Sequence, residues 1–299
     1  MNLYLLAGGE GKRLRPITRV IPKPLVTVFG KTLLEHALDF WSPIVRNVYV
    51  LTEHTEVSRF AAGRGVNVIH TLPGEGTVCA LRVVEQLGPG IIVPTDHVYA
   101  NRGAVRGVPD DLFDKHDFGV FVTPASEFKP NLGYVVTYPD GKSRYLEKPK
   151  RKPRNPFYAS LGVYFYSGKG NLYERALQDE SSPPTIDYRI AVKLNNIPYV
   201  VLDTEWFDIT YIHDLELATL DPGNDIYGWP AVWKRNSERC VVYDPDGLVF
   251  LDNVHDVIVV TGNGRVAVQS ITNWYELKHK ILEKQQFYRQ WREKYDVRT

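Results

Sequence analysis

The sequence predicts an α/β fold, a Rossmann-like mixed sheet that is mostly parallel and sandwiched by helices, with a small β-rich and helical C-terminal extension. Three observations predict it. Short apolar runs alternate with helical patterns over the first hundred residues, a hairpin pattern follows from Phe118 to Tyr166, and short strands at even spacing precede a final helix.

The first part of the chain alternates strand and helix patterns. Four short runs, rich in β-branched residues and bounded by turn residues, are expected as buried strands: Leu3–Ala7, Asn47–Leu51, Val66–His70 and Ile91–Pro94. Apolar residues recur at helical spacing in Thr32–Trp41 and Thr77–Leu87. In such an alternation the strands run parallel, and ligands bind beyond their carboxyl ends.

The middle of the chain changes pattern. Two strands, Gly133–Tyr138 and Ser143–Glu147, flank a Pro-Asp-Gly turn and predict a hairpin, so the sheet is expected to be mixed. Helical patterns return at Asn171–Gln178 and Ile186–Leu194, and a strand is expected at Tyr199–Leu202.

A turn cluster at Asp221–Asn224 predicts a boundary between a catalytic domain, 1–221, and a C-terminal segment, 222–299. The segment shows four short strands but no repeat of fixed period, and a last helix with Thr272 as its N-cap. Apolar residues form a stripe along this helix: Trp274, Leu277, Ile281, Tyr288, Trp291 and Tyr295. The stripe fits equally a helix packed on its own chain and a subunit contact in a homodimer.

Composition excludes several classes of protein. The formal net charge is +1, with 43% hydrophobic and 24% charged residues, so no overall field attracts nucleic acid or an acidic membrane. No apolar run approaches the roughly 18 residues of a membrane span. The two cysteines, Cys79 and Cys240, lack metal or redox spacing. We expect a cytoplasmic protein without a nucleic-acid or membrane partner.

The glycine-rich turn after the first strand is the most informative segment. Gly8, Gly9 and Gly11 are followed at once by Lys12 and Arg13. Glycine lets backbone N–H groups approach phosphate oxygens closely, and cations then add charge-assisted hydrogen bonds. A third cation, Lys23, is held between two prolines, which suits a group that must stay fixed while charge develops on a phosphoryl centre.

Two common phosphate-binding motifs do not fit this turn. A Walker A motif requires glycine five residues before its Gly-Lys pair, where this chain has Leu6. The dinucleotide motif fails as well, because Leu14 stands where its third glycine belongs.

The pattern Leu-Ala-Gly-Gly-x-Gly-x-Arg-Leu-x-Pro, followed by Pro-Lys-Pro-Leu, resembles the sugar nucleotidyltransferase (NDP-sugar pyrophosphorylase) family over residues 5–31. The resemblance implies the nucleotide-diphospho-sugar transferase fold and a reaction between a nucleoside triphosphate and a sugar 1-phosphate. It implies nucleotide binding by Leu6, Ala7, Gly8, Gly9, Gly11 and Lys12, and catalysis by Arg13 and Lys23. Lys12 departs from the family, which often has Thr or Ser there.

The resemblance continues to about residue 220. It implies that Gly76 and Thr77 contact the nucleotide, although a glycine turn with Thr77 as an N-cap is an equal alternative for the threonine. It also implies that Asp96, directly after a strand, and Asp208 bind Mg²⁺, with helix capping the alternative for Asp208. His97 is expected to form structural hydrogen bonds.

The resemblance also implies a sugar-phosphate-binding segment that contains Gly133, Glu147 and Lys148. It implies that Glu147 accepts hydrogen bonds from sugar hydroxyls and that Lys148 neutralises the phosphate. The basic run that continues to Arg154 is expected to be solvated. Three departures from the family, Ser160, Leu161 and Thr210, prevent the sugar specificity and one loop shape from being carried over.

The substrate pair is suggested by two stretches, Pro94–His97 and Cys240–Val260, which resemble mannose-1-phosphate guanylyltransferases. GTP with mannose 1-phosphate is therefore the expected pair. Glucose-1-phosphate thymidylyl- or uridylyltransferase is the alternative enzyme. A catalytically silent homologue that binds a nucleotide sugar and regulates a partner is the alternative of another class.

Overall fold

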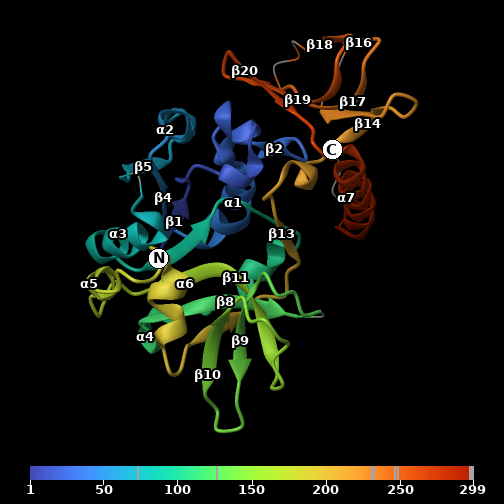
Figure 1. Cartoon of the computed structure of the whole chain (residues 1–299). Coiled ribbons are helices and arrows are strands. Elements are labelled where there is room, and N and C mark those ends of the chain that lie inside the picture. The colour runs from blue at the N-terminus through green and yellow to red at the C-terminus, as the bar shows by residue number, and fades with distance from the viewer. Residues whose placement is uncertain (73, 126, 230–232, 246, 248, 296–299) are drawn as a thin grey trace. The chain divides into compact units, whose positions relative to one another are not determined.

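The computed structural model describes residues 1–72, 74–125, 127–229, 233–245, 247 and 249–295. The chain forms two compact units (Figure 1). The first comprises Met1–Gly9 and Leu34–Phe207, and the second Glu10–Leu33 and Asp208–Thr299. This grouping does not test the predicted boundary at Asp221, which stays a prediction. In the first unit, a mixed nine-stranded sheet confirms the predicted α/β class.

The centre of that sheet is parallel. Its strand order is β10-β9-β11-β6-β1-β4-β5, with β8 paired to β11 and β12 to β8. β1 runs parallel to both β4 and β6, so its carboxyl end lies at the edge where ligands of such sheets bind. The strands are β1 Asn2–Leu6, β4 Asn47–Thr52, β5 Asn67–His70, β6 Gly90–Pro94, β8 Phe118–Pro124, β9 Gly133–Thr137, β10 Ser143–Glu147, β11 Phe157–Tyr166 and β12 Tyr199–Val201.

The predicted hairpin is confirmed as antiparallel β9 and β10, which lie at one edge of the sheet (Figure 1). The helices are α1 Leu33–Trp41, α2 Thr55–Ala62, α3 Cys79–Leu87, α4 Leu112–Lys115, α5 Leu172–Leu177 and α6 Ile186–Arg189. The helix expected over Ile186–Leu194 ends at Arg189 and continues as a 3₁₀ turn, Ala191–Lys193. Buried aromatic and aliphatic side chains from α3, β8 and β11 form a core on one side of the sheet.

The second unit contains a smaller sheet with the order β14-β15-β17-β19-β20. β15, β17 and β19 are parallel to one another, and β16 and β18 form a second parallel pair, so successive strands alternate between two sheets. The sequence predicts the short strands, but their spacing gives no sign of parallel pairing. The strands are β2 Thr27–Val28, β3 Lys31–Thr32, β14 Ala218–Asp221, β15 Ile226–Trp229, β16 Trp233–Arg235, β17 Glu238–Tyr243, β18 Phe250–Asp252, β19 His255–Gly262 and β20 Arg265–Ser270.

The last helix, α7 (Trp274–Tyr295), packs on its own chain within the second unit. Trp291 stacks on Phe29 at a ring distance of 5.3 Å, and Arg292 lies over the same ring at 4.9 Å. Tyr288 is buried and donates a hydrogen bond to the carbonyl of Asp214. The first of the two explanations for the apolar stripe therefore holds for these residues, whereas the homodimer stays a prediction.

The start of α7 differs from the prediction by one residue. The amide N–H of Glu276 donates to Asn273 Oδ1 at 3.2 Å, and Asn273 Nδ2 donates back to Glu276 at 3.2 Å. Asn273, and not Thr272, is thus the capping side chain. Within the described part of the chain, every helix is too short or too polar to cross a membrane.

Candidate active site

The first half of the glycine turn continues from β1 in the first unit. Ala7 is buried; its N–H donates to Leu51 at 2.8 Å and its carbonyl accepts from Thr52 Oγ1 at 2.9 Å. Leu6 lies partly buried at the strand end, while Gly8 and Gly9 are exposed. Gly9 has φ = +96°, a conformation that side chains other than glycine rarely adopt. The strand therefore presents an exposed backbone turn at its carboxyl end.

Two residues that follow β4 bind this turn. The Gly9 N–H donates to Glu53 Oε1 at 3.2 Å, and the His54 ring lies 3.1 Å from the Gly9 carbonyl oxygen through Nε2. A carboxylate oxygen here accepts the kind of bond that a phosphate oxygen would accept from the same N–H. Glu53 thus shows that the turn can bind an anionic oxygen, although nothing in the sequence pattern singles Glu53 out.

The second half of the glycine turn belongs to the second unit. Gly11 has φ = +57°, and an added Cβ would lie 2.7 Å from the Thr18 methyl and 3.3 Å from Lys23 Cβ. Gly11 and Lys23 therefore lie close together, while the contact of each with a phosphate stays a prediction. Lys12 is 68% exposed and pairs with Glu10 at 3.1 Å, and Arg13 is exposed. Both cations remain accessible to a polyanionic ligand.

The predicted nucleotide loop at Gly76 and Thr77 makes close structural contacts. Gly76 has φ = +62°, and a Cβ there would lie 2.0 Å from the Pro184 carbonyl oxygen. Thr77 Oγ1 accepts from the Ile186 N–H at 3.0 Å, so this hydroxyl caps α6 and not its own helix. These contacts explain the presence of glycine at 76 and threonine at 77 without a ligand. Their contact with nucleotide stays a prediction.

The predicted sugar-phosphate residues lie together, because Gly133 at the start of β9 pairs with Glu147 at the end of β10 and Lys148 follows directly. Lys148 Nζ pairs with Glu147 Oε1 at 3.0 Å. Burial opposes the charge of Lys148, but the hydrogen bond to Glu147 and the negative charges of Glu147 and Asp187 together outweigh burial and raise the pKa of Lys148. A Cβ on Gly133 would lie 2.2 Å from the Tyr145 hydroxyl and 2.9 Å from Glu147 Oε2. Glycine at 133 therefore leaves the space that Tyr145 and Glu147 occupy.

The departures at Ser160 and Leu161 lie in an irregularity of β11, where the register shifts between Ser160 and Val163. Ser160 Oγ accepts from the Gly162 N–H at 3.1 Å, and Gly162 has φ = +62°. Leu161 is fully buried. The bulge turns Ser160 toward Tyr145, whose hydroxyl lies 3.4 Å from Ser160 Oγ.

A buried carboxyl group that the sequence does not predict lies beside this site. Asp187 Oδ1, on α6, accepts from Tyr145 at 2.8 Å and also from the Tyr164 hydroxyl. Burial, and then the negative charge of Glu147, raise the pKa of Asp187 to about 6. The sequence carries no sign of this role, because Asp187 stands in a four-residue helix whose contacts come from two distant strands.

Asp187 makes the stability of the protein depend on pH in a defined direction. In the unfolded chain the Asp187 carboxyl has the ordinary pKa of 3.8, whereas in the folded protein its pKa is about 6. Between about pH 4 and 6 the folded state therefore binds more protons than the unfolded chain. The free energy of unfolding should therefore fall as pH rises through this window, by about 3 kcal/mol for this group. Urea unfolding of Asp187→Asn should lack this fall, whereas the exposed Asp140→Asn should retain it. Parallel pH profiles for wild type and Asp187→Asn would contradict the assignment.

The first of the two predicted metal ligands, Asp96, lies next to a small sheet of β7 (His97–Tyr99) and β13 (Trp206–Asp208). Asp96 directly precedes β7 in the first unit, and its side chain is 31% exposed. His97 is buried; its Nε2 lies 3.5 Å from Asp96, and its ring contacts Trp206, as expected of a structural histidine. Among the described residues, no group of three or more His, Cys, Asp or Glu side chains is arranged as a metal site.

Asp208 begins the last segment of the second unit. Its Oδ2 accepts from Thr210 Oγ1 at 2.5 Å, so the departure at Thr210 supplies a hydroxyl to this carboxylate. The loop is fixed by Asp214 Oδ2, which accepts from the N–H groups of Thr210 at 3.0 Å and Tyr211 at 2.6 Å. Asp214 in turn pairs with Lys284 of α7 at 2.9 Å. The last helix therefore supports the loop that carries a predicted ligand.

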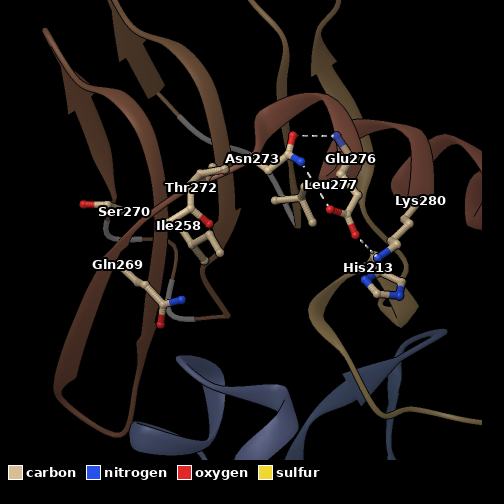
Figure 2. Close-up of a pocket in the computed structure, with 10 residues that line it drawn as sticks. His213, Ile258, Gln269, Ser270, Thr272, Asn273, Glu276, Leu277 and Lys280 are labelled. Carbon is tan, nitrogen blue, oxygen red and sulfur yellow. Dashed lines mark hydrogen bonds and ion pairs between the residues drawn. The ribbon is translucent and has the colours of Figure 1, made fainter.

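A polar pocket of about 200 Å³ lies in the second unit between the end of β20 and the first turns of α7. Figure 2 shows His213 and Lys280 on one side of it, with Glu276 and Asn273 joined by hydrogen bonds. Burial lowers the pKa of His213. None of the residues predicted to bind nucleotide, sugar phosphate or metal lines this pocket, which is therefore distinct from the predicted active site.

Similar proteins of known sequence include a glucose-1-phosphate thymidylyltransferase of an Actinoplanes species. It is 32% identical over 186 residues, which cover 56% of this chain and 58% of the relative. The bifunctional protein GlmU of Methanococcus aeolicus is 25% identical over 229 residues, covering 72% of this chain and 53% of GlmU. The chain thus spans about half the length of such relatives.

Among solved structures, the fold is similar to that of a protein described as mannose-1-phosphate geranyltransferase from Thermus thermophilus. The TM-score is 0.64 at 20% identity, and the match covers 94% of this chain and 98% of the other. This likeness concerns the fold and extends past residue 221, because it covers nearly the whole chain. Residues 4–221, including the glycine turn, Asp96, Glu147 and Asp208, match the family described as nucleotidyl transferase, and the chain belongs to that family.

Proposed function

We propose that the protein joins a nucleoside triphosphate to a sugar 1-phosphate and releases pyrophosphate. The observation that carries the proposal is the glycine turn at the carboxyl end of β1, within a segment that matches the nucleotidyl transferase family. The Gly9 N–H already donates to a carboxylate oxygen. Lys12 and Arg13 follow this turn directly, in a place suited to a polyphosphate.

The proposed chemistry is an in-line displacement. An oxygen of the sugar 1-phosphate attacks the α-phosphorus, the new P–O bond forms, and the bond to pyrophosphate breaks. The nucleophile is already an anion, so no side chain needs to remove a proton. The protein's task is to bring two polyanions together and to stabilise the charge of the transition state. Arg13 would hold the leaving pyrophosphate, and Lys23 and Lys148 would neutralise the attacking phosphate.

Asp96 and Asp208 are the residues proposed to hold Mg²⁺. Both offer partly exposed carboxylate oxygens, the donors that Mg²⁺ prefers, and it commonly takes one or two of them together with phosphate oxygens. When bound, the ion would neutralise negative charge on the α-phosphate. The thymidylyltransferase relative and the family match support the reaction class, and the metal assignment rests on the sequence resemblance.

GTP and mannose 1-phosphate are the proposed substrate pair, on the resemblance of Pro94–His97 and of the strands around β17 and β19. The relatives favour a second pair, because one acts as a glucose-1-phosphate thymidylyltransferase and another is a UTP–glucose-1-phosphate uridylyltransferase of Synechocystis. We place GTP with mannose 1-phosphate first, and dTTP or UTP with glucose 1-phosphate second.

A matrix of nucleotides against sugar 1-phosphates tests the proposal. GTP, UTP, dTTP and ATP are each mixed with mannose, glucose and N-acetylglucosamine 1-phosphates and Mg²⁺, and pyrophosphate release is measured. We expect the highest kcat/KM with GTP and mannose 1-phosphate. A maximum with glucose 1-phosphate and dTTP or UTP would select the second pair. No release from any mixture, together with tight binding of a nucleotide sugar, would instead identify a regulatory homologue.

A further inference from the structure

Tyr145 lies between two carboxyl groups at the sugar-phosphate site. Its hydroxyl oxygen is 2.8 Å from Asp187 Oδ1 and 3.2 Å from Glu147 Oε2. A phenol carries one proton and can donate it along only one of these directions. The contact with Asp187 is the shortest and so favours it as the acceptor over Glu147 Oε2 at 3.2 Å and Ser160 Oγ at 3.4 Å.

The surroundings strengthen this competition. Tyr145 is 3% exposed and the Glu147 side chain 9%, so water does little to weaken the contacts. Tyr164 donates to the same oxygen of Asp187, which holds that carboxyl in place from β11. The opposite oxygen of Glu147 is engaged by Lys148. Burial and the charges of Asp187 and Glu147 raise the pKa of Tyr145 well above 10, so the phenol keeps its proton at working pH.

The position of Asp187 is itself fixed by the nucleotide loop. The Ile186 N–H donates to Thr77 Oγ1 at 3.0 Å, and the Pro184 carbonyl packs against Gly76. The short helix α6 is therefore held against the Gly76–Thr77 loop, and its Asp187 reaches Tyr145 of β10 from there. Asp187 is held where it competes with Glu147 for one proton.

We propose that Asp187 is a positioning residue for sugar-phosphate binding: by accepting the Tyr145 proton, it keeps an oxygen of Glu147 available to accept from a sugar hydroxyl. This inference rests on the proposed function. Asp187 itself need not touch the substrate. Without Asp187, the Tyr145 hydroxyl would donate to Glu147 and compete with the sugar.

The proposed competition predicts how KM and kcat change in a set of variants, each measured with the best substrate pair. Asp187→Leu should raise KM for the sugar 1-phosphate about tenfold, and leave kcat and the KM for nucleotide within about twofold. Adding Tyr145→Phe to Asp187→Leu should restore KM to within about threefold of wild type. Tyr145→Phe alone should change KM less than threefold. Tyr166→Phe removes a phenol on the same strand that donates to Glu85 and contacts neither Asp187 nor Glu147, so it is the matched control and should leave KM unchanged.

Several results would overturn the inference while the proposed function stands. These are an unchanged KM in folded Asp187→Leu, a double variant no better than the single one, or a tenfold loss in Tyr145→Phe alone. If Asp187→Leu does not fold, Asp187→Asn replaces it, because an amide oxygen accepts less strongly. KM should then rise about threefold and return on adding Tyr145→Phe. Absence of pyrophosphate release by the wild type with every substrate pair would instead overturn the proposed function and, with it, this inference.

Discussion

Asp96→Asn is expected to lower kcat for pyrophosphate release by at least about 10³-fold while the protein remains folded. Asparagine keeps the shape of the side chain and one acceptor oxygen, so the contact with His97 can persist. It removes the negative charge that attracts a divalent cation. Because the cation is proposed to neutralise charge that develops in the transition state, the loss should appear mainly in kcat.

Asp208→Asn is expected to have the same effect for the same reason. The Thr210 hydroxyl can still donate to the amide oxygen, so the loop held by Asp214 should stay in place. Initial rates are measured over a range of Mg²⁺ concentrations, and circular dichroism and thermal unfolding check the fold. Asp110→Asn, at an exposed position, is the control and should behave as the wild type. A kcat within about tenfold of wild type in either variant would remove that aspartate from the metal site.

Gly76→Ala is expected to reduce the free energy of unfolding by about 2 to 5 kcal/mol. Two costs add. A non-glycine residue at φ = +62° costs about 1–2 kcal/mol, and forcing a methyl group against packed atoms costs about 1–3 kcal/mol. The second cost arises because the new Cβ would lie 2.0 Å from the Pro184 carbonyl oxygen, a backbone atom that cannot rotate away. Urea unfolding measures the loss.

Gly74→Ala separates these two costs. Gly74 lies in the same loop with φ = +85°, but a Cβ there meets nothing within 4 Å. We expect this variant to lose only the conformational part, about 1–2 kcal/mol. Equal losses in the two variants would show that the segment at Pro184 moves aside without cost. A raised KM for nucleotide in Gly76→Ala, measured where it is folded, would add the predicted contact with substrate to the structural role.

Local patterns in the sequence are sufficient for much of the fold. The parallel strands β1, β4, β5 and β6, the β9–β10 hairpin and the long helix α7 each appear within a few residues of their predicted bounds. Each is specified by its own hydrophobic period and turn residues, which act over short distances along the chain. The glycine turn can also be predicted from the sequence, because Gly9 and Gly11 have positive φ, which glycine adopts without steric cost.

Contacts between segments that are distant along the chain cannot be predicted from local sequence patterns. The parallel pairing of β15, β17 and β19 depends on register between strands more than ten residues apart, and nothing local encodes it. The short helix α6 ends early, because its stability comes from Thr77 and Tyr145 and not from a long apolar face.

The sequence by itself determined the family, the glycine turn with its cations and the order of the acidic and basic residues along the chain. Only the tertiary structure decided that the Gly9 N–H donates to Glu53, that Thr210 donates to Asp208, and that Asp187 and Glu147 both lie within hydrogen-bond distance of the Tyr145 hydroxyl. The reason is physical. Phosphate-binding turns depend on local backbone conformation, whereas the partner and pKa of a buried carboxyl depend on groups that folding brings from other elements.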